Sequence, residues 1–327
     1  MEISLVLVLL LVLAAEFVNG WTDSPNAIAT VVGTRSLSPL QAVAMAAVMN
    51  MLGVLSGTKV AATIGKGIVD SSVISLTTVA GAMVSIVIWS TVAARWGIPT
   101  SETHALVAGL AGAGFATAGP GVLVASGWKK VLLGLLFSSV LGFVGGLVLM
   151  TAIYWLFRKS TPAATREPFR FLQILSSAFM AFSHGSNDGQ KFMGIFALAL
   201  VLGGVLPEFT IPLWVIFLCA AVMALGTLTG GWRIMETMGM KITRLQTHQG
   251  FAAEVAAAST IELATYFGIP LSTTHTITSS IVGVGATRSL SAVRWGVTGQ
   301  LVTAWIITFP ACALISAAVV TILRAFD

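Results

Sequence analysis

Two short polar segments interrupt apolar stretches of this chain, and each carries an acid. The first is EFVNGWTDSPNAIAT (16–30), which follows the wholly apolar run Leu5–Ala15, and the second is FSHGSNDGQKFMGIFALAL (182–200). A carboxylate inside hydrocarbon costs at least ~2.5 kcal/mol, so it usually faces a partner or an aqueous cavity. We therefore expect Asp23 and Asp188 to lie on one central cavity rather than in lipid.

Glycine or proline flanks each acid, with Gly20 and Pro25 in the first segment and Gly185 and Gly189 in the second. These residues favour a break in the helix, and non-helical backbone at membrane depth is tolerated where it lines a cavity. Broken helices that carry Asp and Asn present oxygen ligands for a hard cation such as Na⁺, or a carboxylate able to carry a proton. The alternative is a solvated loop, which is the weaker interpretation because the segment occurs twice.

A second motif also occurs twice, as PTSETH (99–104) and PLSTTH (270–275). Proline at the first helical turn with Ser and Thr beside it predicts a helix start. Free N–H groups and a partial positive charge make such a start a site for oxyanions. The predicted hydroxyl donors are Ser101 and Thr103 in the first copy and Ser272 and Thr274 in the second. One copy alone would indicate plain N-capping; two copies favour an anion clamp between facing half-helices.

Other polar residues in apolar stretches have less defined roles. Lys191, three residues after Asp188, is predicted to form a salt bridge with it on one helix turn, the alternative being attraction of an anion. His104 and His275 occupy matching positions and are expected to be packing residues. Glu254 and Glu262 could join a cation site or a proton path, and their roles stay open.

The composition explains why these residues need a cavity. Of 327 residues 56% are hydrophobic and only 9% are charged, against roughly 25% charged in soluble domains. The runs 72–94, 130–157 and 291–322 are long enough to cross a hydrocarbon core of about 30 Å. We predict an all-α polytopic protein of the cell membrane, whose first apolar segment is retained because no basic region precedes it.

The chain also repeats itself. Besides the two acid segments, SGTKVAATIGKGI (56–68) matches GGWRIMETMGMKI (230–242), and GIPTSETHALVAGLAGAG (97–114) matches GIPLSTTHTITSSIVGVG (268–285). Three motif pairs in the same order predict two transmembrane repeats around a central site, which is typical of transporters. The expected units are the repeats 1–157 and 169–327, joined by a cytoplasmic linker, 158–168, whose neighbouring basic residues follow the positive-inside rule.

The repeats are expected to be inverted in topology, with broken helices and paired re-entrant hairpins. Inverted repeats require an odd number of crossings in each half, and hydropathy leaves that number open. No phosphate-binding loop of the G-x-x-x-x-G-K-[ST] type is present, so ATP-driven pumping by this chain is not expected.

These motifs resemble those of the inorganic phosphate transporter (PiT) family, whose signature is approximately G-x-N-D-x-x-N-A in each half. The first copy reads N-G-W-T-D-S-P-N-A and the second H-G-S-N-D-G-Q-K-F. The paired P-x-S-x-T-H segments and GGWRIMETMG are similar to that family as well. Three departures stand out: Thr22 and Lys191 each replace an asparagine, and Glu102 replaces a hydroxyl residue.

The resemblance implies secondary active import of inorganic phosphate, driven by Na⁺ or H⁺, with no cofactor and no enzymatic activity. It implies that Na⁺, if it is the coupling ion, is bound by Asp23 and Asp188. The cation site implied by the family consists of Asp23, Asn26, Asn187 and Asp188. The implied phosphate ligands are Ser101, Thr103, Ser272, Thr273, Thr274, Asn26 and Asn187. Lipid is an expected partner, nucleic acid is not, and a homodimer stays open.

Three other functions are alternatives to phosphate transport. Some relatives of this family carry sulfate, but sulfate cannot donate hydrogen bonds to Asp23 and Asp188, which would repel it. An anion channel would use the paired segments as an open filter. An intramembrane hydrolase would need one asymmetric Ser/His/Asp set, whereas Ser and His recur here symmetrically.

Overall fold

The computed structural model describes residues 3–70, 72 and 74–325, and within these residues the chain forms helices and no strand. One isolated bridge joins Val69 to Leu123. Residues 1–2, 71, 73 and 326–327, which the expected repeats and the apolar run 72–94 include, lie outside the described residues. The predicted all-α class is confirmed.

The first half contains six α-helices and one short 3₁₀ helix, η1, among the described residues. They are α1 (Ile3–Gly33), α2 (Pro39–Val54), α3 (Lys59–Gly67), α4 (Leu76–Arg95), α5 (Glu102–Ala118), η1 (Pro120–Val122) and α6 (Ala125–Leu156). The second half contains α7 (Pro162–His184), the π-helix η2 (Gly185–Gly189), α8 (Gln190–Leu202), α9 (Leu213–Thr229), α10 (Trp232–Glu236), the π-helix η3 (Thr237–Lys241), α11 (Thr247–Tyr266), α12 (Thr273–Ala286), the 3₁₀ helix η4 (Leu290–Ala292) and α13 (Trp295–Arg324).

Among the described helices, α1, α4, α6 and α13 are each long and apolar enough to cross a membrane. Two helix pairs of the described chain are apolar enough when taken together but are bent, as a broken span or a re-entrant loop would be: α3 turns by 73° from α2, and α10 with η3 turns by 66° from α9. The two bends fall at the matching segments 56–68 and 230–242, as the sequence repeat predicts. The chain is therefore a multi-pass membrane protein with broken helices in both halves.

The expected break at Asp23 is absent, because α1 continues through Pro25 to Gly33. Proline lacks an N–H group, so the carbonyl four residues earlier, that of Trp21, loses its helical donor. The N–H group of Gly231 lies 3.3 Å from this carbonyl oxygen and replaces the missing donor. The second acid segment is not broken either; it forms η2 between α7 and α8.

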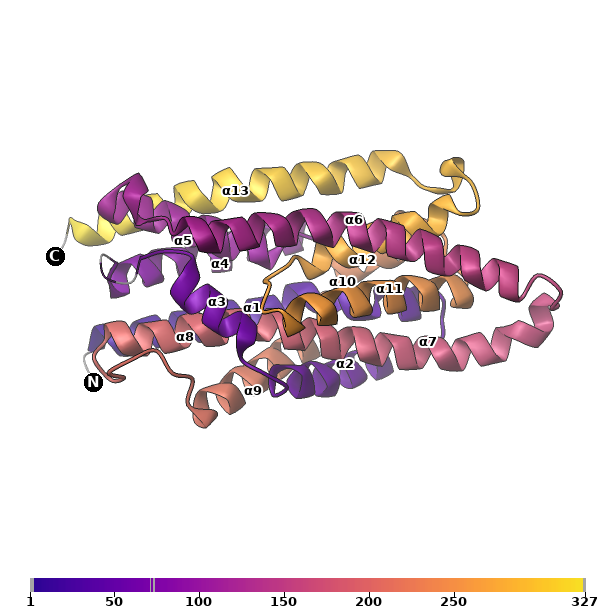
Figure 1. Cartoon of the computed structure of the whole chain (residues 1–327), viewed down its shortest axis with the longest axis horizontal. Coiled ribbons are helices and arrows are strands. Elements are labelled where there is room, and N and C mark those ends of the chain that lie inside the picture. Colours follow the sequence, from indigo (N-terminus) through magenta and orange to yellow (C-terminus); the bar gives the residue numbers. More distant parts are fainter. Residues whose placement is uncertain (1–2, 71, 73, 326–327) are drawn as a thin grey trace.

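The two halves are interlaced (Figure 1). Helix α1 packs against α9 and α2 against α7, while α5 packs against α13 and α6 against α12. Both hydrophobic cores therefore draw residues from both halves. The connection between α6 and α7 is residues 157–161, and residues 162–168 of the expected linker form the first turns of α7.

Figure 1 shows that α1 begins and α13 ends at the same end of the bundle, while the α6–α7 connection lies at the opposite end. Each half therefore starts at one end and finishes at the other. This is the arrangement that an odd number of crossings in each half would produce.

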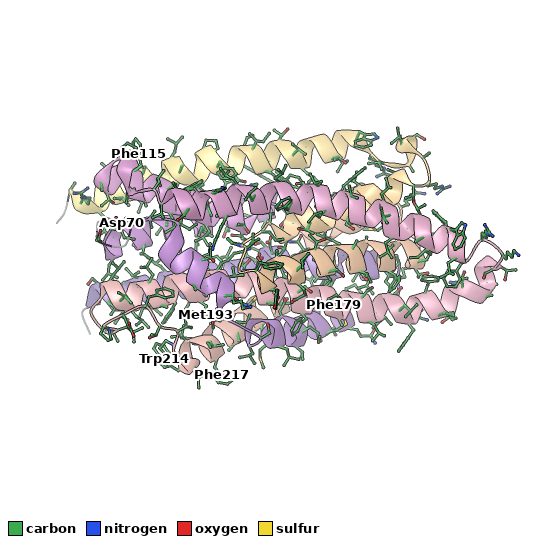
Figure 2. All side chains as sticks on the ribbon, in the orientation of Figure 1. Asp70, Phe115, Phe179, Met193, Trp214 and Phe217 are labelled. Carbon is green, nitrogen blue, oxygen red and sulfur yellow. The ribbon has the colours of Figure 1, made fainter. Side chains whose placement is uncertain are left out.

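The outer surface of the bundle is apolar, as a lipid-facing surface must be. Phe179, Trp214 and Phe217 project outward from it (Figure 2), and Phe217 is 61% exposed. Further large apolar side chains are exposed along α6 and α13, including Leu136 and Leu314. The polar side chains singled out from the sequence lie inside the bundle instead.

A buried site of acids and hydroxyls between the halves

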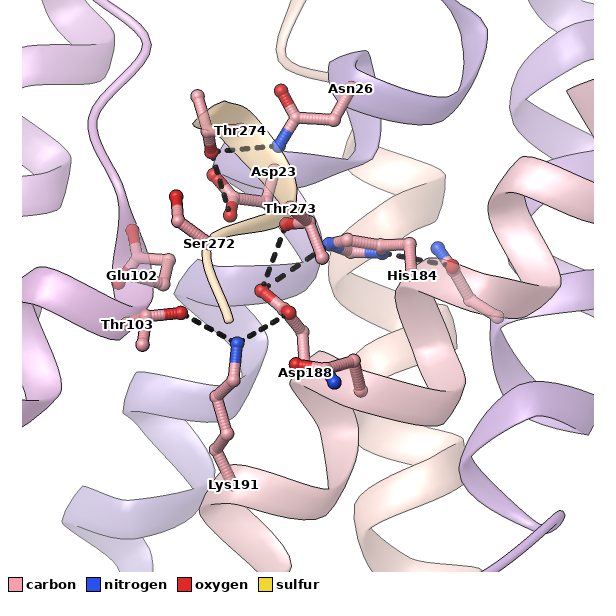
Figure 3. Close-up of polar contacts among 12 residues, drawn as sticks. Asp23, Asn26, Glu102, Thr103, His184, Asp188, Lys191, Ser272, Thr273 and Thr274 are labelled. Atoms are coloured by element: carbon pink, nitrogen blue, oxygen red, sulfur yellow. Dashed lines mark hydrogen bonds and ion pairs between the residues drawn. The ribbon is translucent and has the colours of Figure 1, made fainter. Parts of the chain in front are cut away.

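Four segments meet at the centre of the bundle and bring together the residues of both repeated motifs (Figure 3). They are the middle of α1, the end of α7 with the π-helix η2 and the first turn of α8, the start of α5 and the start of α12. The residues that they contribute are almost completely buried: Asp23, Asn26, Ser101, Glu102, Thr103, His184, Asn187, Asp188, Lys191, Ser272, Thr273 and Thr274.

Asp23 and Asp188 approach each other closely, as expected. One ligand atom each from Asp23, His184 and Asp188 lies within 4.8 Å of the other two, and all three residues are buried. Two carboxylates so close together repel unless a cation is shared or a proton is taken up. The three side chains therefore form a group that could hold a cation.

Asp188 accepts hydrogen bonds from two side chains and has a histidine beside it. Lys191 Nζ lies 2.6 Å from its Oδ1 atom, which confirms the predicted salt bridge on one helix turn. The hydroxyl of Thr273 donates to Oδ2 at 3.2 Å. His184 Nε2 lies 3.8 Å from the same oxygen.

The environment of Asp23 is different. Among the described residues no Lys or Arg forms an ion pair with it, and its neighbour is the hydroxyl of Thr274, 3.4 Å from Oδ2. Asn26 donates from Nδ2 to the Thr274 hydroxyl oxygen at 3.0 Å. The other amide atom, Asn26 Oδ1, is buried and has no hydrogen-bond partner in the described part of the chain. Asn26 thus leaves an acceptor oxygen without a donor, next to a carboxylate that no Lys or Arg of the described residues pairs with.

Helices α5 and α12 both start at this site, each with a serine N-cap. Ser101 accepts from the N–H of His104 at 3.3 Å, and Ser272 accepts from that of His275 at 3.2 Å. The capping interpretation is therefore correct for both serines, although an accepting hydroxyl still has its own hydrogen to donate. The prolines differ from expectation: each precedes the cap by two residues and lies outside the helix.

The two helix starts are tied to each other by a reciprocal pair of hydrogen bonds. Thr103, in the first turn of α5, donates to the carbonyl oxygen of Leu271 at 2.7 Å. Thr274, in the first turn of α12, donates to the carbonyl oxygen of Thr100 at 3.0 Å. Thr103 and Thr274 hold equivalent places in the repeat, so the bonds exchange under a twofold relation between the halves.

The same exchange recurs away from the site. Thr63 donates to the carbonyl of Gly268 at 2.7 Å, and its equivalent Thr237 donates to that of Gly97 at 2.9 Å. Such pairs are what two structurally similar halves, packed about a pseudo-twofold axis, would produce.

Asn187 forms hydrogen bonds that hold the residues preceding α12 in place. Its Oδ1 atom accepts from the N–H of Leu271 at 3.3 Å, while Nδ2 donates to the hydroxyl of Thr265 at 2.8 Å and to the carbonyl of Ile269 at 3.3 Å. All three contacts hold backbone or side chains of the second half in place around the helix start.

His184 is a member of the site that the sequence analysis did not select. Thr227 donates to Met223, so its hydroxyl oxygen accepts from Asn50 Nδ2 at 2.9 Å, and Asn50 Oδ1 therefore faces His184 Nδ1 at 3.0 Å. Nδ1 must then carry a proton, so in the neutral ring it is Nε2 that offers a lone pair toward Asp188. The signal in the sequence was the four-residue spacing between His184 and Asp188.

Two of the departures from the family signature contact each other. Thr22, which replaces an asparagine, lies with its hydroxyl 3.0 Å from Glu102 Oε1, and Glu102 replaces a hydroxyl residue. The second oxygen, Oε2, is buried without a partner within the described residues. The first half thus adds an acid where the second half has the hydroxyl of Thr273.

The remaining polar residues lie beside the site. The His104 and His275 rings contact edge to face with centroids 4.4 Å apart, and His275 stacks on Trp305 at 3.7 Å, which agrees with a packing role. Glu254 accepts from the hydroxyls of Thr30 and Ser176. Glu262 accepts from Ser186 at 2.6 Å.

Together, the fold and the site define a polytopic membrane protein that holds acids, hydroxyls and two helix starts in one buried centre between similar halves, a construction found in transporters. A sequence model of the phosphate transporter family matches residues 19–316. The chain belongs to this family, whose members compared below are transporters and not enzymes.

Individual relatives agree. The chain is 48% identical over 304 residues to a probable low-affinity inorganic phosphate transporter of Rhizobium meliloti (strain 1021), covering 92% of this chain and 91% of that protein. It is 39% identical over 323 residues to a protein of the same description from Bacillus subtilis (strain 168), covering 97% of each. A solved structure described as the sodium-dependent phosphate transporter superposes with a TM-score of 0.92 at 26% identity, covering 100% of both chains.

Proposed function

We propose that this protein imports inorganic phosphate across the cell membrane, driven by a gradient of Na⁺ or H⁺. The observation that carries the proposal is the meeting of two kinds of group at one buried place. The carboxylates of Asp23 and Asp188 lie beside the starts of α5 and α12. Acids attract a cation and helix starts attract an oxyanion, so the site suits simultaneous binding of both.

The cation would bind at Asp23. This carboxylate has no Lys or Arg partner among the described residues, and Asn26 Oδ1 beside it lacks a donor there. Hard cations prefer such oxygen ligands, while a proton on either acid would serve the same purpose. Asp188, which lies close to Asp23, would add negative charge beside this cation from the second half. The contacts of Asn187 support a positioning role around the start of α12.

Phosphate would bind between the starts of α5 and α12. The first N–H groups of a helix have no intrahelical acceptor and can donate to an oxyanion. Ser101 and Ser272 accept their capping bonds and retain hydroxyl hydrogens for phosphate oxygens. Thr103, Thr273 and Thr274 already donate within the protein, so each would exchange its present acceptor for phosphate.

The interlaced halves would provide the alternation of access. Repeats of inverted topology can pack in two equivalent ways around one site, which opens it to either side of the membrane in turn. The position of the α6–α7 connection opposite the first and last helices supports this topology. The basic residues at that connection suggest that it faces the cytoplasm.

Reconstituted liposomes test the proposal. We expect saturable uptake of labelled phosphate when an inward Na⁺ or pH gradient is imposed, accelerated exchange when unlabelled phosphate is present inside, and much weaker uptake of labelled sulfate. Equal uptake of the two anions would overturn the choice of substrate. Phosphate flux that neither saturates nor responds to a cation gradient would indicate a channel.

A further inference from the structure

The amino group of Lys191 lies in a position suited to a metal cation. Its side chain is completely buried, and Nζ contacts Asp188 Oδ1 and the Thr103 hydroxyl, each at 2.6 Å (Figure 3). Nζ also contacts the Leu271 carbonyl oxygen at 2.8 Å. An ammonium group has three N–H donors and no acceptor. Three oxygen acceptors therefore match the charged form completely.

The hydroxyl of Thr103 supports the same assignment. It donates its own hydrogen to the carbonyl of Leu271, so toward Lys191 it offers a lone pair. A carboxylate, a hydroxyl oxygen and a backbone carbonyl are the kinds of oxygen ligand that a hard cation takes.

The first half has the same oxygen groups without the ammonium. The equivalents of Asp188, Thr103 and Leu271 are Asp23, Thr274 and Thr100, and Thr274 donates to the Thr100 carbonyl as Thr103 does to that of Leu271. At the place of Lys191 this half has Asn26, whose amide reaches Thr274 at 3.0 Å. An amide carries no charge, so the charge of Asp23 is left for a mobile ion.

We propose that the ammonium of Lys191 is a tethered cation that permanently fills one of two equivalent cation sites. Asp188 then needs no mobile ion, and the transport cycle carries a cation only at Asp23. This inference rests on the proposed function for its consequence in transport, but the filled site itself can be tested by ion binding alone.

The decisive comparison is made in an Asp23→Asn background, which removes the mobile-ion site. We expect this variant, purified in detergent, to bind no ²²Na⁺ and to show no increase in Tm when NaCl replaces choline chloride. The double variant D23N/K191N should regain one Na⁺ per chain and a Tm that rises with Na⁺, because a ligand that binds the folded state stabilises it. D23N/K191M is the matched control; its thioether supplies no oxygen, so it should stay unresponsive.

A folded D23N/K191N protein that binds no Na⁺ and whose Tm does not rise with NaCl would overturn the proposal. If the Lys191 variants do not fold, proteins that keep Lys191 still test the proposal. The unchanged protein should bind at most one Na⁺ per chain, and the D23N variant should bind none. Two Na⁺ per chain in the unchanged protein would show that Lys191 does not occupy a cation site. In liposomes the net charge moved per phosphate should rise by one from the unchanged protein to K191N. Absence of any driven phosphate uptake by the unchanged protein would contradict the proposed function, but it would leave the result of the binding experiment standing.

Discussion

Thr103 of α5 and Thr274 of α12 are far apart in the sequence, yet each forms a hydrogen bond to the backbone that precedes the other residue's helix. The Thr103 hydroxyl donates to Leu271, immediately before the cap of α12, and the Thr274 hydroxyl donates to Thr100, immediately before the cap of α5. Because each bond is the counterpart of the other, the relative position of the two helix starts is fixed from both sides.

Replacing either threonine by valine keeps the volume but removes the donor. We expect T103V and T274V each to lower the free energy of unfolding by about 1–3 kcal/mol, because each leaves a buried polar group short of a partner. T274V removes the hydroxyl donor to the Thr100 carbonyl, whereas in T103V the Leu271 carbonyl keeps Lys191 Nζ but the ammonium loses one acceptor. Thermal melting in detergent measures both losses. Thr303 donates to its own helix at Gly299 and is exposed, so T303V should change little. A large loss in only one of the two variants would contradict the reciprocal arrangement.

Removing the charge of either central acid should abolish gradient-driven uptake. D23N and D188N each keep the side-chain size and lose a carboxylate that binds or balances the cation. Flux of labelled phosphate in liposomes is the measurement, with D70N as control because Asp70 is exposed in a loop beside Ser72. Near-normal uptake by either site variant would refute the assignment of that acid.

The same two variants should differ in stability. D188N leaves the buried ammonium of Lys191 without its carboxylate, and breaking a buried ion pair by removing one partner costs about 3–5 kcal/mol. D23N breaks no such pair. We therefore expect D188N to melt at a clearly lower temperature than D23N; equal melting temperatures would show that the Lys191–Asp188 pair adds little.

Capping and phosphate binding by Ser272 can be separated with two substitutions. S272A should lose about 1 kcal/mol of stability because alanine cannot cap, whereas glycine at an N-cap costs only a few tenths. Both variants lack the hydroxyl donor to phosphate. If Ser272 contacts phosphate, titration calorimetry should show both variants with similarly weakened phosphate affinity despite their different stabilities. Unchanged affinity in S272G would mean that the serine is a cap only.

Gly231 must stay small for α1 to continue through Pro25. A Cβ atom at this position would lie 2.7 Å from the Trp21 carbonyl oxygen and 2.8 Å from Pro25 Cγ. G231A should therefore displace the N–H that completes α1 and lower Tm. G296A is the matched control: nothing lies within 4 Å of its added methyl group, and alanine is a better helix former than glycine. A G231A protein as stable as G296A would rule out the proposed role of this contact.

The sequence was sufficient to predict the parts of the site that follow from the repeat and from the cost of charge in lipid. It predicted that Asp23 and Asp188 would lie close together, and that helices would start near Pro99 and Pro270; the helices begin just after their caps, Ser101 and Ser272. The salt bridge of Lys191 followed from spacing on one helix turn. These predictions depend on local patterns, or on a duplication that is visible in the printed chain.

What the sequence did not reveal depends on contacts between distant residues. Proline and glycine around Asp23 predicted a break, yet Gly231 supplies the donor that keeps α1 continuous. Likewise, the free lone pair of His184 Nε2 is set by Asn50, whose amide is oriented by Thr227. No local pattern encodes either contact, because the partner belongs to a different part of the chain.

The interlacing of the halves also has a consequence for how the protein is made. The ribosome releases α1 first, but the N–H that completes its backbone belongs to Gly231, and α9, against which it packs, follows much later. The packing of α5 is completed still later, because α5 packs against α13, which is synthesised after the other described helices. In an unfinished chain, the Trp21 carbonyl of α1 is therefore unpaired and Asp23 is not yet enclosed by the helices of the second half. We expect the insertion machinery to shield the polar groups of the nascent first half from lipid until α13 has entered the membrane.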